Sequence, residues 1–231
     1  MALLVFIAAK PDTIHAQTPI ALELVLAIDT STSVDDAEYS LQKQGLSLAF
    51  SHPEVVGAIE ALGDLGVAVS VIQWAGTGLQ KTVIDWQLLR NSVDAHRMSA
   101  ALANMPREIR GMTDIGSVIR YAVSSLDENA FAGYRRVIDI SGDGSSDAFS
   151  TSQERDRAIG KAVTINGLVI YNEDHDLGDL AKQDVREHYL QNVIGGDGAF
   201  LMTAGSFEEF VIAMRNKLVR EITGPATALL K

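Results

Sequence analysis

Hydrophobic and polar positions along this chain form blocks that predict strands and helices in turn. Residues 21–28 are apolar except for Glu23, a pattern typical of a strand buried on both faces of a parallel sheet. Residues 84–88 alternate between apolar and polar side chains, which predicts a half-exposed antiparallel strand at the sheet edge. Further strands are predicted at 66–74, 136–140, 163–171 and 200–202.

Stretches of helical periodicity separate these strands. The predicted helices are 35–50, 53–62, 92–105, one from Ile115 to about Leu126, one ending near Ala162, 177–191 and one from Ser206 to the stop at Gly224-Pro225. Ser150 or Ser152 is the expected cap of the helix that ends near Ala162. Ser206 and Glu209 have the spacing of a capping box. The last helix is expected to bury Phe207, Phe210, Val211, Met214 and Leu218.

The predicted helix 35–50 has apolar residues on two sides. We expect one face to pack on the sheet, with Gly45 allowing close approach; it consists of Ala37, Leu41, Gly45 and Leu48. The other side carries Tyr39, Leu46 and Phe50. Either neighbouring loops cover this second side, or it is an exposed surface for a partner.

Strands that alternate with helices indicate an α/β fold. We expect a single doubly wound, mostly parallel sheet with helices on both faces and one antiparallel edge strand. The predicted domain spans 20–223, between a leader at 1–19 and a short tail at 224–231. In such sheets, ligands bind at the carboxyl ends of the strands.

The leader has some features of a signal peptide. Ala2 to Ala9 is an apolar run, and Ile14-His15-Ala16 is a candidate cleavage site, although no Lys or Arg precedes the run. We therefore expect an exported protein, periplasmic or secreted. No other stretch approaches the roughly 18 apolar residues of a membrane span.

Composition narrows the class of partner. The 231 residues carry a formal net charge of -11, which argues against nucleic acid and anionic membranes as partners. The absence of cysteine excludes disulfides, thiolate zinc sites and cysteine nucleophiles. The acidity suits cations or partners with basic surfaces, and it also aids solubility.

The strongest chemical signal follows the first strand. Asp29, Ser31 and Ser33 place one carboxylate and two hydroxyls in a single turn at a strand end. These are hard oxygen ligands of the kind that a small divalent cation prefers. Taken alone, the same residues are also common at the N-terminus of a helix.

Two further polar loops are expected at the same edge of the sheet. Thr113 precedes the helix that begins near Ile115, and Asp143 follows the strand 136–140. The three loops together favour a metal site over a simple helix cap.

These residues resemble the metal-ion-dependent adhesion site of von Willebrand factor A-type domains. The resemblance rests on Asp29-x-Ser31-x-Ser33, on Thr113 in a Gly-x-Thr context and on Asp143 in Ser-Gly-Asp-Gly, and it covers roughly residues 20 to 223. Within this superfamily, the sequence is similar to those of a group of uncharacterised bacterial proteins. The matching stretches are 41–45, 135–144, 165–168 and 192–196.

The resemblance implies a role for each residue. Ser31 and Ser33 would contact the metal through their hydroxyls, and Thr113 would do so directly or through water. Asp29 and Asp143 would bind directly or hold coordinated waters. Mg²⁺, or Mn²⁺, suits such a site because it takes octahedral oxygen ligands. A protein partner would offer an acidic side chain to the metal.

Other polar residues near this edge have weaker signals. Asp114 either orients ligands or caps the helix that follows, and we favour the cap. Asp147 and the acidic loop 172–176 either form a second cation site, shape the partner surface or are simply solvated, and we favour solvated loops. The histidines show no metal-ligand spacing, so a zinc hydrolase is unsupported.

Three functions follow from this reading. The leading one is a non-enzymatic, exported module that captures a protein partner through a divalent metal. The second is a metal-dependent hydrolase that uses Asp29 and Asp143 to activate water, although no general base or phosphate-binding motif supports it. The third is an intracellular assembly component that partners an ATPase.

Overall fold

The computed structural model describes residues 17–171 and 179–224. Within these residues the strands form one six-stranded sheet. The strands are β1 Thr18–Asp29, β2 Val67–Trp74, β3 Gln80–Leu89, β4 Phe131–Gly142, β5 Val163–Ile170 and β6 Leu201–Ala204. β1, β3 and β4 extend beyond the predicted limits, and β6 lies one to two residues further along the chain than predicted.

The sheet has the order β3-β2-β1-β4-β5-β6. All neighbouring pairs are parallel except β2 and β3, so the antiparallel strand lies at the edge, which confirms the prediction. Because β1 and β4 are parallel neighbours, with Ile28 opposite Ser141, the loops that follow them begin at the same edge. This register is what brings Asp29 and Asp143 together.

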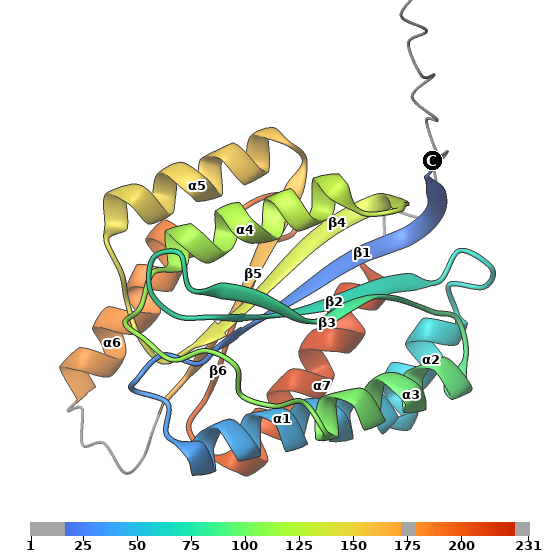
Figure 1. Ribbon diagram of the computed structural model, residues 1–231, viewed down its shortest axis with the longest axis horizontal. Coiled ribbons are helices and arrows are strands. Elements are labelled where there is room, and N and C mark those ends of the chain that lie inside the picture. The colour runs from blue at the N-terminus through green and yellow to red at the C-terminus, as the bar shows by residue number, and fades with distance from the viewer. Residues whose placement is uncertain (1–16, 172–178, 225–231) are drawn as a thin grey trace, which may run out of the picture.

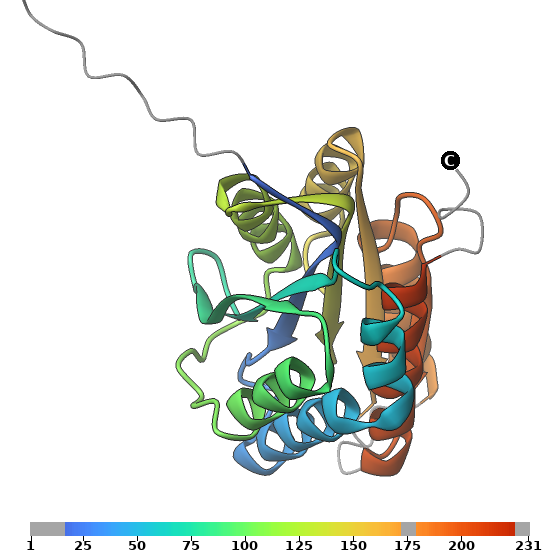
Figure 2. The ribbon, with the colours of Figure 1, turned by 90° about the vertical axis from the view of Figure 1, so that its right-hand side faces the viewer.

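Helices cover both faces of the sheet (Figure 1). Within the described residues they are α1 Asp36–Ser51, α2 Pro53–Glu60, α3 Ser92–Ala103, α4 Ile115–Glu128, α5 Ala148–Gly160, α6 Asp179–His188 and α7 Phe207–Thr223. A single turn of π-helix, η1 Tyr189–Val193, continues α6. Figure 2 shows α1, α2, α3 and α7 on one side of the sheet, and α4 and α5 on the other.

The central strand β1 is buried on both faces. Leu22, Leu24 and Leu26 belong to the core under α1 and α7, whereas Val25 and Ala27 belong to the core under α4 and α5. This explains why its sequence does not alternate. The exception, Glu23, is buried but satisfied, because it accepts hydrogen bonds from Gly133 N–H at 2.6 Å and from the Asn129 amide at 3.0 Å.

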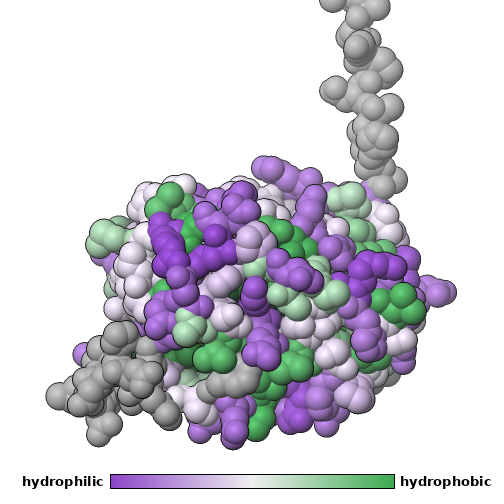
Figure 3. All heavy atoms as spheres, turned by 60° about the horizontal axis from the view of Figure 1, so that its bottom comes forward, coloured by the Kyte–Doolittle hydropathy of each residue, from purple (hydrophilic) through white to green (hydrophobic). Residues whose placement is uncertain are grey.

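The predicted orientation of α1 was wrong. Its buried side carries Tyr39, Leu46 and Phe50, while Leu41 and Leu48 are 40% and 46% exposed. Gly45 does permit a close approach, but to Phe210 of α7, where an added Cβ would lie 2.6 Å from the ring. The aromatic side chains therefore fill the space over the sheet, whereas Leu41 and Leu48 face solvent. The face of the molecule in Figure 3 mixes hydrophobic and hydrophilic residues.

Two helix caps also differ from prediction. Asp147, rather than Ser150 or Ser152, caps α5 by accepting the Ser150 N–H at 2.7 Å. Ser206 caps α7 as expected, accepting the Glu209 N–H at 3.2 Å. The Glu209 carboxylate, however, accepts from Gly205 rather than from Ser206, so the capping box is only half formed.

The apolar face of α7 largely agrees with its prediction. Phe210, Met214 and Leu218 are buried, and Val211 is partly buried. The side chain of Phe207 lies outside the described part of the structure. This face of α7 therefore packs into the core that also contains buried residues of α1 and α2.

A buried ionic cluster fixes α7 to the sheet. Lys217 is fully buried and contacts Asp139 of β4 at 2.9 Å and Glu221 of α7 at 2.5 Å. The Asn166 amide of β5 donates to the same Glu221 at 2.8 Å. No pattern in the sequence pointed to this cluster, because its members lie on three different elements, β4, β5 and α7.

Several predictions fall outside the described residues. They concern the leader, the acidic loop 172–176 and the tail beyond Gly224, and they stay predictions. β1 begins at Thr18, two residues before the predicted start of the domain. Within residues 17–171 and 179–224, no helix combines the length and apolar character that a membrane crossing requires.

Candidate metal centre

The candidate site begins at the last residue of β1. Asp29 is completely buried, and its Oδ1 accepts the Ser31 N–H at 2.8 Å. The chain then leaves the sheet, with Thr30 still hydrogen-bonded through its N–H to the Trp74 carbonyl of β2. This tight turn is what directs the hydroxyls of Ser31 and Ser33 to one side.

A chain of hydrogen bonds joins the two serines to the loop after β4. The hydroxyls of Ser31 and Ser33 lie 3.0 Å apart, and Ser33 donates to Oδ1 of Asp143 at 2.8 Å. Two carboxylates and two hydroxyls from β1 and β4 thus form one polar group. The sequence prediction that these loops converge at one edge is supported for these four residues.

Thr113 approaches the same group from a third segment. A Cβ added to Gly144, the residue after Asp143, would lie 3.5 Å from the Thr113 hydroxyl, so Thr113 borders the loop after β4. Two backbone bonds hold its segment in place: Thr32 N–H to Gly111 C=O at 2.8 Å, and Asp114 N–H to Ala75 C=O at 3.0 Å.

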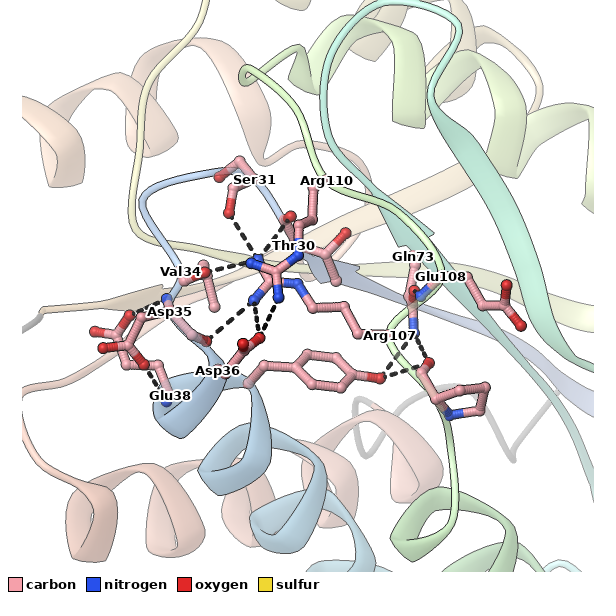
Figure 4. A network of polar contacts seen from close by, with 12 residues as sticks. Thr30, Ser31, Val34, Asp35, Asp36, Glu38, Gln73, Arg107, Glu108 and Arg110 are labelled. Carbon is pink, nitrogen blue, oxygen red and sulfur yellow. Dashed lines mark hydrogen bonds and ion pairs between the residues drawn. The ribbon is translucent and has the colours of Figure 1, made fainter.

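Arg107 supports the first loop, and sequence reasoning missed it. Its guanidinium donates to the carbonyls of Thr30 at 3.0 Å, Ser31 at 3.0 Å and Val34 at 2.6 Å (Figure 4). The side chain is only 7% exposed and also contacts Asp36. One planar fork therefore satisfies three carbonyls that would otherwise face away from water.

Gln73 fixes the segment that carries Arg107. Its amide donates to the Pro106 carbonyl at 2.7 Å and to the Tyr39 hydroxyl at 2.8 Å, and its carbonyl accepts the Glu108 N–H at 2.8 Å (Figure 4). Gln73 lies in a mostly apolar strand and Arg107 follows Pro106. Those are the only signals the sequence offered, and neither indicates which groups the side chains meet.

The neighbouring acidic residues serve mainly as caps. Asp114 accepts from Ser117 N–H at 3.0 Å and from the Thr77 hydroxyl at 2.5 Å, which confirms the predicted cap. Burial opposes ionisation of Asp114, but these hydrogen bonds lower its pKa below 3.8. Asp147, which caps α5, lines a cavity of about 570 Å³ together with Thr113 and Asp114.

Asp29 is in an environment that disfavours its charge. Burial, and then the nearby Asp143 carboxylate, raise the pKa of Asp29 from 3.8 to about 7. The N–H groups of Ser31 and Asp143 partly oppose this, yet within the described residues no hydrogen bond of normal geometry reaches Asp29 Oδ2. A buried carboxylate oxygen without a partner is costly, and a cation would relieve that cost.

The donor set fits a hard cation better than zinc. It offers carboxylates and neutral hydroxyls, which suit Mg²⁺ or Mn²⁺. No cluster of three or more His, Cys, Asp or Glu side chains occurs in the described ranges. His188 accepts a hydrogen bond from the Ser146 N–H at 3.5 Å, and His52 caps α2. Both of these histidines therefore already have a hydrogen-bonding role.

The strand order and the polar edge define a von Willebrand factor A-type fold, and solved structures agree. A pilus adhesin, SpaC from Lactobacillus rhamnosus GG, matches with a TM-score of 0.62 at 15% identity over 88% of this chain and 30% of that one. A von Willebrand factor type A protein from Catenulispora acidiphila matches with a TM-score of 0.59 at 15% identity, over 88% and 43% of the two chains.

A third similar structure comes from the mussel byssus. Proximal thread matrix protein 1, with a zinc-occupied MIDAS motif, matches with a TM-score of 0.59 at 14% identity over 91% of this chain and 47% of that one. This chain thus spans less than half of each of these three proteins. No curated protein matches it.

The chain itself belongs to the family described as "Protein of unknown function (DUF1194)", whose model matches residues 19–226.

Proposed function

We propose that this protein is a non-enzymatic binding module that captures a protein partner through a divalent cation held by Asp29, Ser31, Ser33, Thr113 and Asp143. The observation that carries the proposal is the Ser31–Ser33–Asp143 hydrogen-bond chain beside the unpartnered Oδ2 of Asp29. Mg²⁺ or Mn²⁺ is the proposed metal, because the donors are carboxylate and hydroxyl oxygens.

The metal would supply a positive charge that offsets two neighbouring carboxylates. Ser31 and Ser33 would bind it through neutral hydroxyls, which leave it able to accept a further anionic oxygen. A carboxylate of the partner would provide that oxygen. Arg107 would hold the Asp29–Val34 loop in shape through its three carbonyl contacts while the partner binds.

The relatives support the partner class and the location. SpaC is a pilus adhesin, and proximal thread matrix protein 1 has been solved with zinc in its MIDAS motif. Together with the apolar run Ala2 to Ala9, they favour an exported adhesion-type protein over an enzyme or an intracellular partner of an ATPase.

Affinity capture tests this function directly. Tagged wild-type protein would be exposed to an extract of the native organism, once with Mg²⁺ and once with EDTA. Three variants would be exposed to the same extract with Mg²⁺: Asp29→Ala, Ser33→Ala and the matched surface control Asp156→Ala. A partner retained only by wild type and the control, and released by EDTA, is expected. Partners retained equally in every arm would contradict metal-bridged capture.

A further inference from the structure

The metal-site residues leave one neighbouring group unexplained. Tyr189, the first residue of the π-helical turn η1, is fully buried. In the described part of the chain its hydroxyl has no hydrogen-bond partner, and neither has the indole N–H of Trp74. A buried hydroxyl of this kind costs free energy that a phenylalanine would avoid, so its presence calls for a reason.

The Tyr189 hydroxyl and Asp29 Oδ2 face the same small region, beside the Trp74 ring. A Cβ added to Gly142 would lie 2.8 Å from Asp29 Oδ2, 2.8 Å from the Tyr189 hydroxyl and 3.2 Å from Cζ2 of Trp74. The Tyr189 hydroxyl is therefore within single-water reach of Asp29 Oδ2, the Asp29 oxygen that has no hydrogen-bond partner among the described residues.

Two glycines make room for this tyrosine. Besides Gly142 beneath the hydroxyl, Gly167 of β5 lies under the ring, where an added Cβ would be 2.9 Å from Cδ1 of Tyr189. The pairing of β4 with β5 places Gly167 opposite Ile140, two residues before Gly142. Adjacent strands thus leave a slot that fits the phenol ring and its oxygen.

The hydroxyl of a tyrosine is protonated at physiological pH, because its ordinary pKa is about 10. A neutral phenol among carboxylates can act as a hydrogen-bond donor at any physiological pH. Tyr189 begins a π-helical turn, and such turns are frequent at functional sites.

We propose that Tyr189 is a positioning residue of the metal site, whose hydroxyl donates to Oδ2 of Asp29 through one water. This inference rests on the proposed function, because it assigns a role toward the same metal. Residues that orient a metal ligand from behind commonly affect metal affinity by about 10- to 100-fold. Tyr189 would do so without touching the metal or the partner.

The test compares Tyr189→Phe with wild type and with the control Tyr121→Phe. Tyr121 contacts Thr82 of the edge strand β3, at 3.3 Å, and is partly exposed. Mn²⁺ affinity would be measured by isothermal titration calorimetry, and metal-free stability by urea denaturation. We expect Tyr189→Phe to weaken Mn²⁺ binding about 10-fold or more with equal or higher metal-free stability, and Tyr121→Phe to leave affinity unchanged.

The outcomes separate the two proposals. Equal Mn²⁺ affinity in wild type and Tyr189→Phe would overturn the role of Tyr189 while leaving the metal site intact. No Mn²⁺ binding by wild type would overturn both. A loss of stability with unchanged affinity would show a purely structural residue.

A second measurement does not depend on the folding of that variant. Wild-type protein labelled with 3-fluorotyrosine gives one ¹⁹F resonance for each tyrosine, and Phe variants at the other four positions, 39, 121, 134 and 171, assign that of Tyr189 by elimination. Mn²⁺ is paramagnetic, so Mg²⁺ is the probe here. We expect Mg²⁺ to shift the Tyr189 resonance and not that of Tyr121; an unmoved Tyr189 signal at saturating Mg²⁺ would contradict the proposal.

Discussion

Ser33 donates a hydrogen bond to Oδ1 of Asp143 over 2.8 Å, joining residues that lie 110 positions apart in the chain. The parallel pairing of β1 with β4 makes this contact possible, because both loops leave the sheet at the same edge. The bond links the two segments on which the proposed metal site depends.

Asp29→Asn should remove metal binding yet stabilise the metal-free protein at high pH. The folded-state pKa of Asp29, about 7, lies above its ordinary value of 3.8. Ionised Asp29 therefore disfavours folding, and this penalty grows as pH rises from about 4 to about 7. Urea denaturation should find the variant more stable than wild type by up to a few kcal/mol at pH 8, given about 1.4 kcal/mol per pKa unit.

The same comparison at pH 4 provides its control. There the two proteins should have similar free energies of unfolding, because Asp29 is protonated in the folded state. A variant that is less stable than wild type at pH 8 would contradict the assigned environment of Asp29.

Arg107→Lys should loosen the loop that carries the serines. Lysine keeps the charge but cannot donate to three separate carbonyls from one planar group. We expect a loss of about 1–3 kcal/mol in unfolding free energy and weaker Mn²⁺ binding by calorimetry. Arg110→Lys is the matched control, since Arg110 is half exposed and pairs with Asp36 alone among the described acidic residues; equal effects of the two substitutions would refute the special role of Arg107.

Lys217→Met should destabilise the protein most strongly above neutral pH. The substitution leaves Asp139 and Glu221 buried without their cation, which typically costs about 3–5 kcal/mol. Burial already raises the pKa of Asp139 to about 7 despite Lys217, so without the lysine the Asp139 carboxyl should be protonated more readily as pH falls. Thermal denaturation should therefore show a smaller deficit at pH 5 than at pH 8. A deficit that is independent of pH would argue against a charge effect.

Two glycine substitutions should act in opposite directions. Gly142→Ala would place a Cβ 2.8 Å from Asp29 Oδ2 and should destabilise the fold and weaken metal binding. Gly57→Ala lies in α2, where no atom stands within 4 Å of the added Cβ, and should stabilise by about 0.5–1 kcal/mol. Chemical denaturation of both variants checks this, and a tolerated Gly142→Ala would show that the space beside Asp29 can expand.

Sequence reasoning reached the sheet and its polar edge because both depend on local patterns. Apolar runs predicted the strands, and Asp29, Ser31 and Ser33 share one turn. The predicted orientation of α1 was wrong because both of its sides carry apolar residues, and the side that is buried is decided by packing against the distant helices α3 and α7. Periodicity alone does not show whether the side with Tyr39 and Phe50 or the side with Leu41 and Leu48 is buried.

The residues that support the site could not be predicted from the sequence, for a different reason. Arg107, Gln73 and Tyr189 act through contacts with groups distant in the chain, and nothing in their immediate sequence marks them. The same holds for Lys217, whose partner Asp139 lies on another element. Such contacts follow from the fold and not from a motif, so they can be found only once the strands are in register.

Titration of Mn²⁺ into the purified wild-type protein, beside Ser33→Ala, tests the central claim most directly. Isothermal titration calorimetry should detect one saturable site per wild-type chain. Affinity should fall about 10-fold or more in Ser33→Ala, because that variant removes both a proposed ligand and the bond to Asp143. Wild-type protein that takes up no Mn²⁺ or Mg²⁺, or a variant that binds as tightly as wild type, would contradict the account.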